Sequence, residues 1–446
     1  MFDLPAVHDL SRRNLLKGML AVGAVGTLGG LTACGDTASP GENGGGTTGM
    51  MHYIANVLAL ESASRGLQEG MKQLGGEFKS TSFDGDQQKM MSQPQLFRSL
   101  GVTGVLSALV ADGSLGQYAA TLSKQKISYL NIGNRPQWSS PADPRFDGYF
   151  LGTMGASFAE ETYVMANLLF RRGGGRGKAI LLGGVKGGLS SDARMFGVLE
   201  ALKKYPDIQV VATTYADWDT TKAQSEIAAL LPAYPDVDYV VSMNDGMALG
   251  ALAALKAARN TRALLMGADG DPTFLDAMAT EERLVGTAAG VLTAVGAFAA
   301  AKIYDAAHGV KFNPLESFLN YDSLVIDTPA AAQALLEITS PDSPFPFDAR
   351  KMSRHLQGDN WELQHKFQVA DVESFDWGSK PGVNAAPRPN GFEWSADYQA
   401  ALDAGGIKTL NDDWTNRLND PYAGVRAKAE TKTGVQGTFE VLGLTV

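Results

Sequence analysis

Two polar residues that could bind a ligand lie at the ends of neighbouring predicted strands. The β-branched run Tyr239–Met243 is followed by Asn244, and the apolar run Ala263–Gly267 leads to Asp269. The Ala- and Leu-rich segment between the runs has the composition of a helix, so the stretch predicts a βαβ unit with parallel strands. Ligands of open α/β sheets bind beside the carboxyl ends of such strands. Asn244 and Asp269 are therefore candidate ligand-binding residues, although their spacing alone does not name the ligand.

Residue combinations typical of covalent, metal or cofactor chemistry are missing from the sequence. The single Cys and the five scattered His exclude an internal disulfide, a cysteine-only metal site and an HExxH pair. The glycine run Gly173–Gly177 superficially suggests a phosphate loop, but Arg172 and Ala179 break the motif and a strand follows the run instead of preceding it. We therefore predict no catalytic residue, no metal and no cofactor, and a protein that binds without doing chemistry.

The elements that must position these residues alternate along the chain. Strands separated by helices of this length predict right-handed crossovers and parallel sheets covered on both faces. The first half has expected strands at 53–60, 78–83, 103–110 and 127–132, with helices at 62–74, 87–100 and 114–124. After 157 the pattern restarts with helices at 158–170, 192–204, 220–231 and 292–308 and strands at 178–182, 208–214 and 323–326.

Polar residues also follow three of the expected strands in the first half. They are Glu61 through Arg65 after the first strand, Asp112 after the third, and the pair Asn134-Arg135 after the fourth. Because these positions share the edge where ligands bind, we add Glu61, Arg65, Asp112, Asn134 and Arg135 to the candidate site. A surface charge before the turn at Pro136 is an equally good interpretation of Arg135.

The amino terminus has the layout of an export signal. The pair Arg12-Arg13 precedes a short, Gly- and Ala-rich apolar stretch, and its surroundings resemble a twin-arginine signal. Leu31-Thr-Ala-Cys34 resembles a lipobox, in which Cys34 becomes the first mature residue and carries lipid. A stray Arg pair and a buried Cys are the alternative. A spanning helix needs about 20 apolar residues, and five Gly between positions 18 and 30 argue against one.

Charge and composition limit the kinds of partner and the cellular location that are expected for this chain. The formal net charge of -10 disfavours a nucleic-acid partner, since phosphate binding needs clustered Lys and Arg. Residues 35–49 are rich in Gly, Thr, Ser, Asn and Pro and predict a flexible tether. The mature chain is therefore expected on the outer side of a membrane, in the periplasm or on the outer face of the cytoplasmic membrane, held by a lipid anchor.

Three strings in the second half resemble a known family. NDGMALGA from Asn244, followed by GADG from Gly267, resembles the second lobe of sugar-binding proteins of the ribose-binding type. SSDARMFG, residues 190–197, resembles the family's Ser-x-x-Ala-Arg-x-x-Gly, and ADWD, residues 216–219, resembles its Ala-Asp-Phe-Asp. Asn134-Arg135 is similar to the family's Asp-Arg pair.

The resemblance implies roles for four residues. Arg194 would contact sugar hydroxyls and the ring oxygen, Trp218 would form an aromatic wall, and Asn244 and Asp269 would complete the set. This fits sugar chemistry, because the C–H face of a sugar packs on an aromatic ring while its hydroxyls need both donors and acceptors. Each residue also has a plainer interpretation: a helix cap for Asn244, a turn for Asp269, core packing for Trp218 and an ion pair for Arg194.

The family fold implies an α/β protein with two Rossmann-like lobes, parallel sheets and a three-segment hinge, as in type I periplasmic binding proteins. A C-terminal extension with four of the six Trp is unlike any part of the family; we expect it either to wrap the lobes or to form a lid or docking surface. The predicted divisions are a signal peptide (1–33), a lipidated Cys and tether (34–50), an N-terminal lobe (51–156 with 291–320), a C-terminal lobe (157–290 with 321–336) and the extension (337–446).

The sequence departs from the family at two places. The expected first loop, Glu61 to Arg65, lacks the aromatic pair that covers the sugar, and no amide stands near Gly290, where the family has a last Gln contact. The sequence therefore matches the fold of the family better than it matches the family's sugar contacts.

The resemblance predicts an extracytoplasmic, monomeric solute-binding lipoprotein that captures a sugar or polyol by lobe closure and delivers it to the permease of an ABC importer. A receptor that presents its closed form to a membrane kinase or chemoreceptor is the alternative, and sequence does not separate the two. A repressor of the lactose-repressor type and an enzyme are disfavoured.

Overall fold

The computed structural model describes residues 44–53, 57–108, 112–133, 146, 148–370, 391 and 393–433, and two sheets organise them. The first sheet has the strand order β13-β11-β5-β4-β3-β1-β2. Its strands are β1 (Thr47–His52), β2 (Glu77–Ser82), β3 (Gly104–Ser107), β4 (Ser128–Ile132), β5 (Phe150–Gly155), β11 (Phe318–Tyr321) and β13 (Phe367–Val369). With α1 (Leu58–Gln73), α2 (Gln87–Ser99), α3 (Asp112–Lys124) and α9 (Leu292–Ala307), this sheet makes the first lobe.

The second sheet has the order β12-β10-β9-β8-β6-β7 and belongs to the second lobe. Its strands are β6 (Arg176–Gly183), β7 (Asp207–Tyr215), β8 (Tyr239–Ser242), β9 (Leu264–Ala268), β10 (Leu284–Ala289) and β12 (Leu324–Ile326). The helices of this lobe are α4 (Phe158–Arg172), α5 (Leu189–Leu202), α6 (Thr220–Leu230), α7 (Asp245–Ala257), α8 (Pro272–Met278) and α10 (Pro329–Thr339).

The chain passes between the two sheets three times on its way from β5 to β12 and once more before β13. The first three passages come after β5, after β10 and after β11, and these three crossings make the hinge; after β12 the C-terminal part of the chain returns to the first sheet as β13. All strand pairs are parallel except those that add the edge strands, β10 with β12 and β11 with β13. The predicted fold class, two α/β lobes on parallel sheets, is confirmed, with the addition of an antiparallel edge strand in each lobe.

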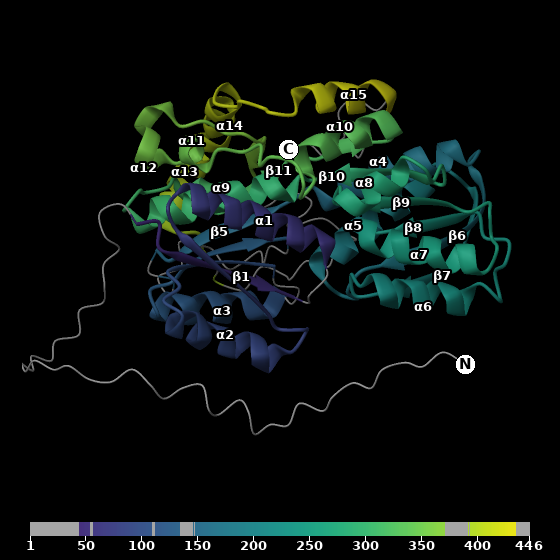
Figure 1. The fold of residues 1–446 in the computed structure, drawn as a ribbon, viewed down its shortest axis with the longest axis horizontal. Helices are drawn as coiled ribbons and strands as arrows, with labels where there is room; N and C mark the ends of the chain where they lie inside the picture. The colour runs from purple at the N-terminus through teal and green to yellow at the C-terminus, as the bar shows by residue number, and fades with distance from the viewer. Residues whose placement is uncertain are drawn as a thin grey trace, which may run out of the picture. The chain divides into compact units, whose positions relative to one another are not determined.

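Close helix packing depends on glycines at the helix contacts. A Cβ on Gly66 of α1 would lie 2.0 Å from the carbonyl oxygen of Thr293, and one on Gly296 of α9 would lie 2.0 Å from that of Ala63. These helices lie side by side on the first sheet (Figure 1). In the second lobe a Cβ on Gly197 of α5 would lie 1.9 Å from the carbonyl oxygen of Ala159 on α4. Glycine therefore lets the backbones of paired helices touch.

The beginning of the first lobe differs from the prediction. The expected strand at 53–60 is wrong, because β1 is Thr47–His52 and residues from Leu58 onward form α1. Leu60, Ala63 and Leu67 follow a helical period and are buried, whereas Met50 and Met51 are fully buried within the sheet. The tether predicted over 34–50 is likewise wrong for residues 47–50, since burial of this strand between β2 and β3 outweighs its Gly- and Thr-rich composition.

The C-terminal segment, residues 340–433 where described, packs on both lobes. Its elements are α11 (Ala349–Met352), α12 (Arg354–Gln357), η3 (Gly358–Asn360), β13, α13 (Ala396–Asp403), α14 (Gly406–Asn416) and α15 (Ala423–Thr433).

The first lobe carries most of this segment. Strand β13 extends the first sheet, α13 packs on η2 (Pro314–Ser317), and the indole of Trp414 meets Phe298 of α9 at 6.3 Å between ring centroids. Arg354 makes two 2.9 Å hydrogen bonds to the carboxylate of Glu316. In contrast, α15 contacts β12 and α10 of the second lobe (Figure 1). The described part of the extension is therefore a wrap that reaches from one lobe to the other.

Among the described residues, no helix combines the length and the apolar character needed to cross a membrane.

Candidate functional site

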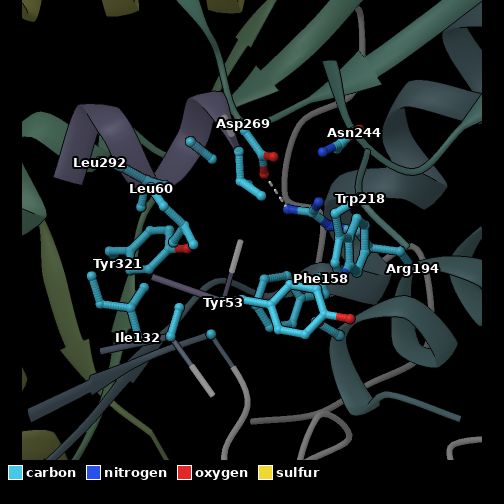
Figure 2. A pocket seen from close by; sticks show the side chains of 15 residues that line it. Tyr53, Leu60, Ile132, Phe158, Arg194, Trp218, Asn244, Asp269, Leu292 and Tyr321 are labelled. Carbon is cyan, nitrogen blue, oxygen red and sulfur yellow. Dashed lines mark hydrogen bonds and ion pairs between the residues drawn. The ribbon is translucent and has the colours of Figure 1, made fainter. Parts of the chain in front are cut away.

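The carboxyl ends of strands from both lobes surround one cavity of about 100 Å³. Figure 2 shows its lining side chains. The first lobe contributes Tyr53, Val57, Ala59, Leu60, Ala108, Ile132, Gly133 and Leu292, the second contributes Phe158, Ser190, Arg194, Trp218, Asn244 and Asp269, and the hinge strand β11 contributes Tyr321. The four residues singled out by the family strings, Arg194, Trp218, Asn244 and Asp269, therefore line the same cavity.

Arg194 is the most heavily bonded of these side chains. Helix α5 carries it, and the hydroxyl of Thr162 on α4 fixes that turn by donating to the carbonyl oxygen of Arg194 at 2.7 Å. Its Nη1 donates to the carbonyl oxygen of Met243 at 2.7 Å, and its Nη2 lies 2.6 Å from Oδ1 of Asp269 and 3.5 Å from Oε2 of Glu161. Its Nε is buried without a hydrogen-bond partner among the described residues. A ligand oxygen could satisfy that donor, since buried donors are rarely left unpaired.

Two aromatic rings flank the same guanidinium. Its Cζ lies 5.1 Å from the ring centroid of Phe158 and 5.7 Å from that of Trp218. Trp218 packs closely on Gly184, where a Cβ would lie 2.3 Å from the indole. The Arg194 fork is thus held in one plane by aromatic stacking and by its hydrogen bonds, so little side-chain entropy remains to be lost on binding.

Two of the site residues occupy strained backbone conformations. Trp218 has φ 66° and Asp269 has φ 111°, and Asp217 beside the indole has φ 51°. Positive φ is uncommon outside glycine and is unfavourable for a bulky residue. Such strain persists where the surrounding structure determines the conformation, which is frequent at ligand sites.

Asn244 serves two purposes. Its Oδ1 caps α7 by accepting from the backbone N–H of Met247 at 2.8 Å, as the plainer interpretation expected. The capping bond leaves the Nδ2 group on the cavity side, where Asn244 is a lining residue. The cap therefore orients an amide donor instead of excluding a role in binding.

A group of buried carboxylates lies behind Asp269. Oδ2 of Asp245 accepts from the backbone N–H of Asp271 at 2.7 Å, whereas Oδ1 of Asp245 and Oδ2 of Asp271 have no partner among the described residues. Burial raises the pKa of Asp245 and of Asp271, and repulsion from neighbouring carboxylates, including Asp269, raises both further. In the sequence, only the closeness of Asp269 and Asp271 could have indicated this group.

The electrostatics of the ion pair follow from the same burial. Burial alone would lower the pKa of Arg194, but the carboxylates of Asp269 and Glu161 outweigh it and raise that pKa. Burial raises the pKa of Asp269, and the guanidinium of Arg194 counteracts part of this shift. Arg194 is therefore a fixed cation, and the carboxylate of Asp269 lies beside it. Burial makes that carboxylate a stronger hydrogen-bond acceptor.

The remaining predicted residues are placed differently. Glu61 is an exposed residue in the first turn of α1 and does not line the cavity. The guanidinium of Arg65 donates to the carbonyl oxygen of Thr339 at the end of α10 (2.7 Å) and to that of Ser343 in the C-terminal segment (3.0 Å). Both were assigned to a loop that is in fact the start of α1. Asn134, Arg135, Cys34 and the side chain of Asp112 lie outside the described residues.

Three aromatic lining residues were missed. Tyr53 stands directly after β1, and it was overlooked because the first strand was placed too late in the sequence. Phe158 begins α4 at the first crossing, and Tyr321 ends β11 at the third crossing. Tyr321 could have been predicted as a lining residue, because it is an aromatic residue at the end of a strand that leads into a crossing between the lobes.

The sequence relationships agree with this architecture. Residues 50–309 match the periplasmic binding protein domain family, which is more than half of the chain. The chain belongs to the periplasmic binding protein family. Residues 9–29 match the twin-arginine translocation pathway signal, so this periplasmic binding protein carries the export signal that the Arg12-Arg13 pair predicted. The resemblance stated from the sequence strings is thereby confirmed.

Individual relatives of this periplasmic binding protein bind carbohydrates or polyols by name. A xylitol-binding protein of Mycolicibacterium smegmatis is 30% identical over 269 residues, covering 59% of this chain and 74% of that protein. A D-allose-binding periplasmic protein of Escherichia coli is 28% identical over 280 residues, covering 59% and 86%. The crystal structure of an ABC transporter solute-binding protein from Actinobacillus succinogenes with bound D-allose superposes with a TM-score of 0.57 at 19% identity, covering 64% of this chain and 99% of that one.

Proposed function

We propose that this protein captures a sugar or a sugar-like polyol between its lobes and delivers it to an ABC importer, without catalysing a reaction. The observation that carries the proposal is the cavity itself, in which a fixed guanidinium, a carboxylate, an amide and several aromatic rings from both sides of a three-crossing hinge face one another. Hinge closure around a ligand is the usual motion of such two-lobed proteins. The ligand drives closure only if it binds the closed form more tightly.

The lining chemistry matches a hydroxyl-rich ligand. Nε of Arg194 and Nδ2 of Asn244 can donate to hydroxyl or ring oxygens, and the carboxylate of Asp269 can accept from hydroxyls. The rings of Trp218 and Phe158 offer apolar faces to C–H groups. A ligand with alternating C–H and O–H groups satisfies both kinds of surface, whereas a purely apolar ligand would leave Arg194 and Asp269 unpaired with it.

The names of the relatives support this ligand class. The matched proteins are named for xylitol and D-allose, an acyclic polyol and a hexose. Calorimetric titration of the full chain with xylitol, D-allose, D-ribose and myo-inositol tests the proposal. Saturable heat with a micromolar or lower Kd for at least one compound is expected. No heat from any of them, together with tight binding of a compound of another class, would refute the carbohydrate assignment.

We also propose that a lipid on Cys34 anchors the protein at the outer face of the cytoplasmic membrane. We expect the anchored protein to be a monomer. The support is the lipobox-like Leu31–Cys34 string after the twin-arginine signal. Phase partitioning of cells expressing the full chain provides the test, with Cys34→Ser as the matched variant. The wild-type chain is expected in the detergent phase and the variant in the aqueous phase. Wild-type protein found only in the aqueous phase would contradict the anchor.

A further inference from the structure

Tyr321 reaches the cavity from an unusual place, the last residue of β11 at the third crossing between the lobes. Figure 2 shows its hydroxyl directed into the cavity, on the side opposite Trp218. The residue is 6% exposed, so its ring is almost completely enclosed. A ring that is buried at a crossing and presents its polar end to the cavity is well placed to contact a bound solute.

Space for this ring is made by a glycine at the second crossing. A Cβ on Gly290 would lie 2.6 Å from Cε2 of Tyr321, closer than real contacts allow. The family resemblance places a Gln that contacts the sugar near position 290, where this chain has Gly290. The ring of Tyr321 occupies the space beside that backbone, where a side chain at position 290 would lie.

The C-terminal segment holds Tyr321 from behind. Within the sheet, Tyr321 pairs with Phe367 of β13, and the backbone N–H of the next residue, Asp322, donates to the carbonyl oxygen of Lys366 at 3.0 Å. The ring of His365 lies 6.4 Å from the ring of Tyr321, centroid to centroid. Strand β13 and Lys366, which precedes it, thus fix the backbone at Tyr321 and at the residue after it.

The same crossing is tied to α15. Nη1 of Arg426 donates to Oδ2 of Asp322 at 2.7 Å, and its Nε donates to Asp420 at 3.1 Å. Helix α15 packs on β12, the strand that follows the crossing. One part of the C-terminal segment therefore pairs with β11 and another part packs on β12. The segment thus contacts both strands that the crossing after Tyr321 connects.

We propose that Tyr321 contacts the bound solute and selects among sugar epimers, and that the C-terminal segment acts as the brace that positions it. This inference rests on the proposed function. A fixed hydroxyl discriminates because a solute that fails to pair with it leaves a buried polar group unsatisfied. The brace gives that hydroxyl one position, and Arg426 and Gly290 are positioning residues for Tyr321.

Titration of the full chain with D-allose, D-glucose, xylitol and D-arabinitol tests the contact. Tyr321→Phe should weaken the best-bound compound by about threefold to tenfold and reduce its preference over its epimer, as expected for loss of one hydrogen bond. Gly290→Ala should weaken the same compound by displacing the ring, yet should have no effect in a Tyr321→Ala background. If wild-type protein binds and Tyr321→Phe leaves every Kd unchanged, the contact is refuted. If wild-type protein binds no carbohydrate of either panel and binds a compound of another class tightly, the proposed function fails first and the inference falls with it.

Arg426→Gln tests the brace, with Asp322→Asn as a second variant should the first not fold. Either change should shift the epimer preference toward that of Tyr321→Phe. Arg417→Gln is the matched control, because it breaks an Arg–Asp pair on the same segment, with Asp413 at 2.8 Å, away from the crossing. The control should lower Tm without changing the preference. An unchanged preference in both Arg426→Gln and Asp322→Asn would overturn the brace while leaving the contact standing.

Discussion

Asp269→Asn is the most informative single change, because it keeps the shape of the side chain and removes only its charge. Oδ1 of Asp269 lies 2.6 Å from Nη2 of Arg194, and the two side chains are 11% and 6% exposed. The carboxylate therefore holds the guanidinium and can also accept from ligand hydroxyls in a nearly dry site. The amide retains one acceptor oxygen, so a purely steric effect is not expected.

The size of the effect follows from the kind of hydrogen bond that is lost. Bonds to a charged group contribute about 1.5–3 kcal/mol and neutral ones about 1 kcal/mol. If Asp269 accepts from two neighbouring hydroxyls, the loss is about 2 kcal/mol, or roughly thirtyfold in Kd. Folding stability should change by less than about 1 kcal/mol, because Glu161 remains 3.5 Å from Arg194 and repulsion with Asp245 and Asp271 is relieved.

Two measurements on the same protein separate binding from folding. Titration calorimetry with whichever panel carbohydrate binds the wild-type chain gives the Kd ratio, and urea unfolding gives the change in stability. Asp276→Asn, at an exposed position on α8 in the same lobe, is the matched control and should leave both unchanged. A Kd for Asp269→Asn within twofold of wild type would remove Asp269 from the set of ligand contacts and refute the reasoning.

Three further predictions concern packing, the C-terminal segment and pH. Gly197→Ala places a Cβ 1.9 Å from a carbonyl oxygen of α4, so urea unfolding should show a loss of about 1–3 kcal/mol together with weaker carbohydrate binding; unchanged stability would contradict this packing. Trp414→Ala should cost about 3–5 kcal/mol within a single calorimetric transition, whereas a separate transition would show that the segment folds independently. Burial and nearby carboxylates raise the pKa of Asp271, so the folded chain keeps a proton that the unfolded chain releases above about pH 4, and stability from this group falls as pH rises. The stability gain of Asp271→Asn over wild type should therefore grow as pH rises above about 4, the ordinary pKa of an Asp side chain. A gain that does not depend on pH, or one equal to that of exposed Asp207→Asn, would contradict this prediction.

Prediction from sequence worked best in the second lobe. The strands there are short β-branched runs and the helices between them have clear boundaries, such as Asn244 capping α7, so local signals and tertiary packing agree. At the start of the first lobe they disagree. Thr47–His52 contains two glycine-neighbouring Thr and two Met, a weak strand signal, and it becomes a strand only because β2 and β3 pair with it on both sides.

The candidate site divides in the same manner. Arg194, Trp218, Asn244 and Asp269 were found from short strings, because each stands at the end of a strand or in the first turns of a helix where the local pattern is readable. Tyr321, which lies far along the chain, could not be found this way. Its place beside Gly290 exists only after the chain has crossed between the lobes.

The alternation of strands and helices, the export signal and the polar residues at the strand ends can be read from the amino-acid sequence, because each depends on neighbours within a few positions of the chain. Three features could be seen only in the folded chain: Arg65 bonds to the C-terminal segment, the carboxylates of Asp245 and Asp271 are buried together, and Arg426 of this segment pairs with Asp322 at the crossing. These features depend on burial and on contacts between residues distant in sequence. Their energies arise only when the two lobes and the segment around them are packed.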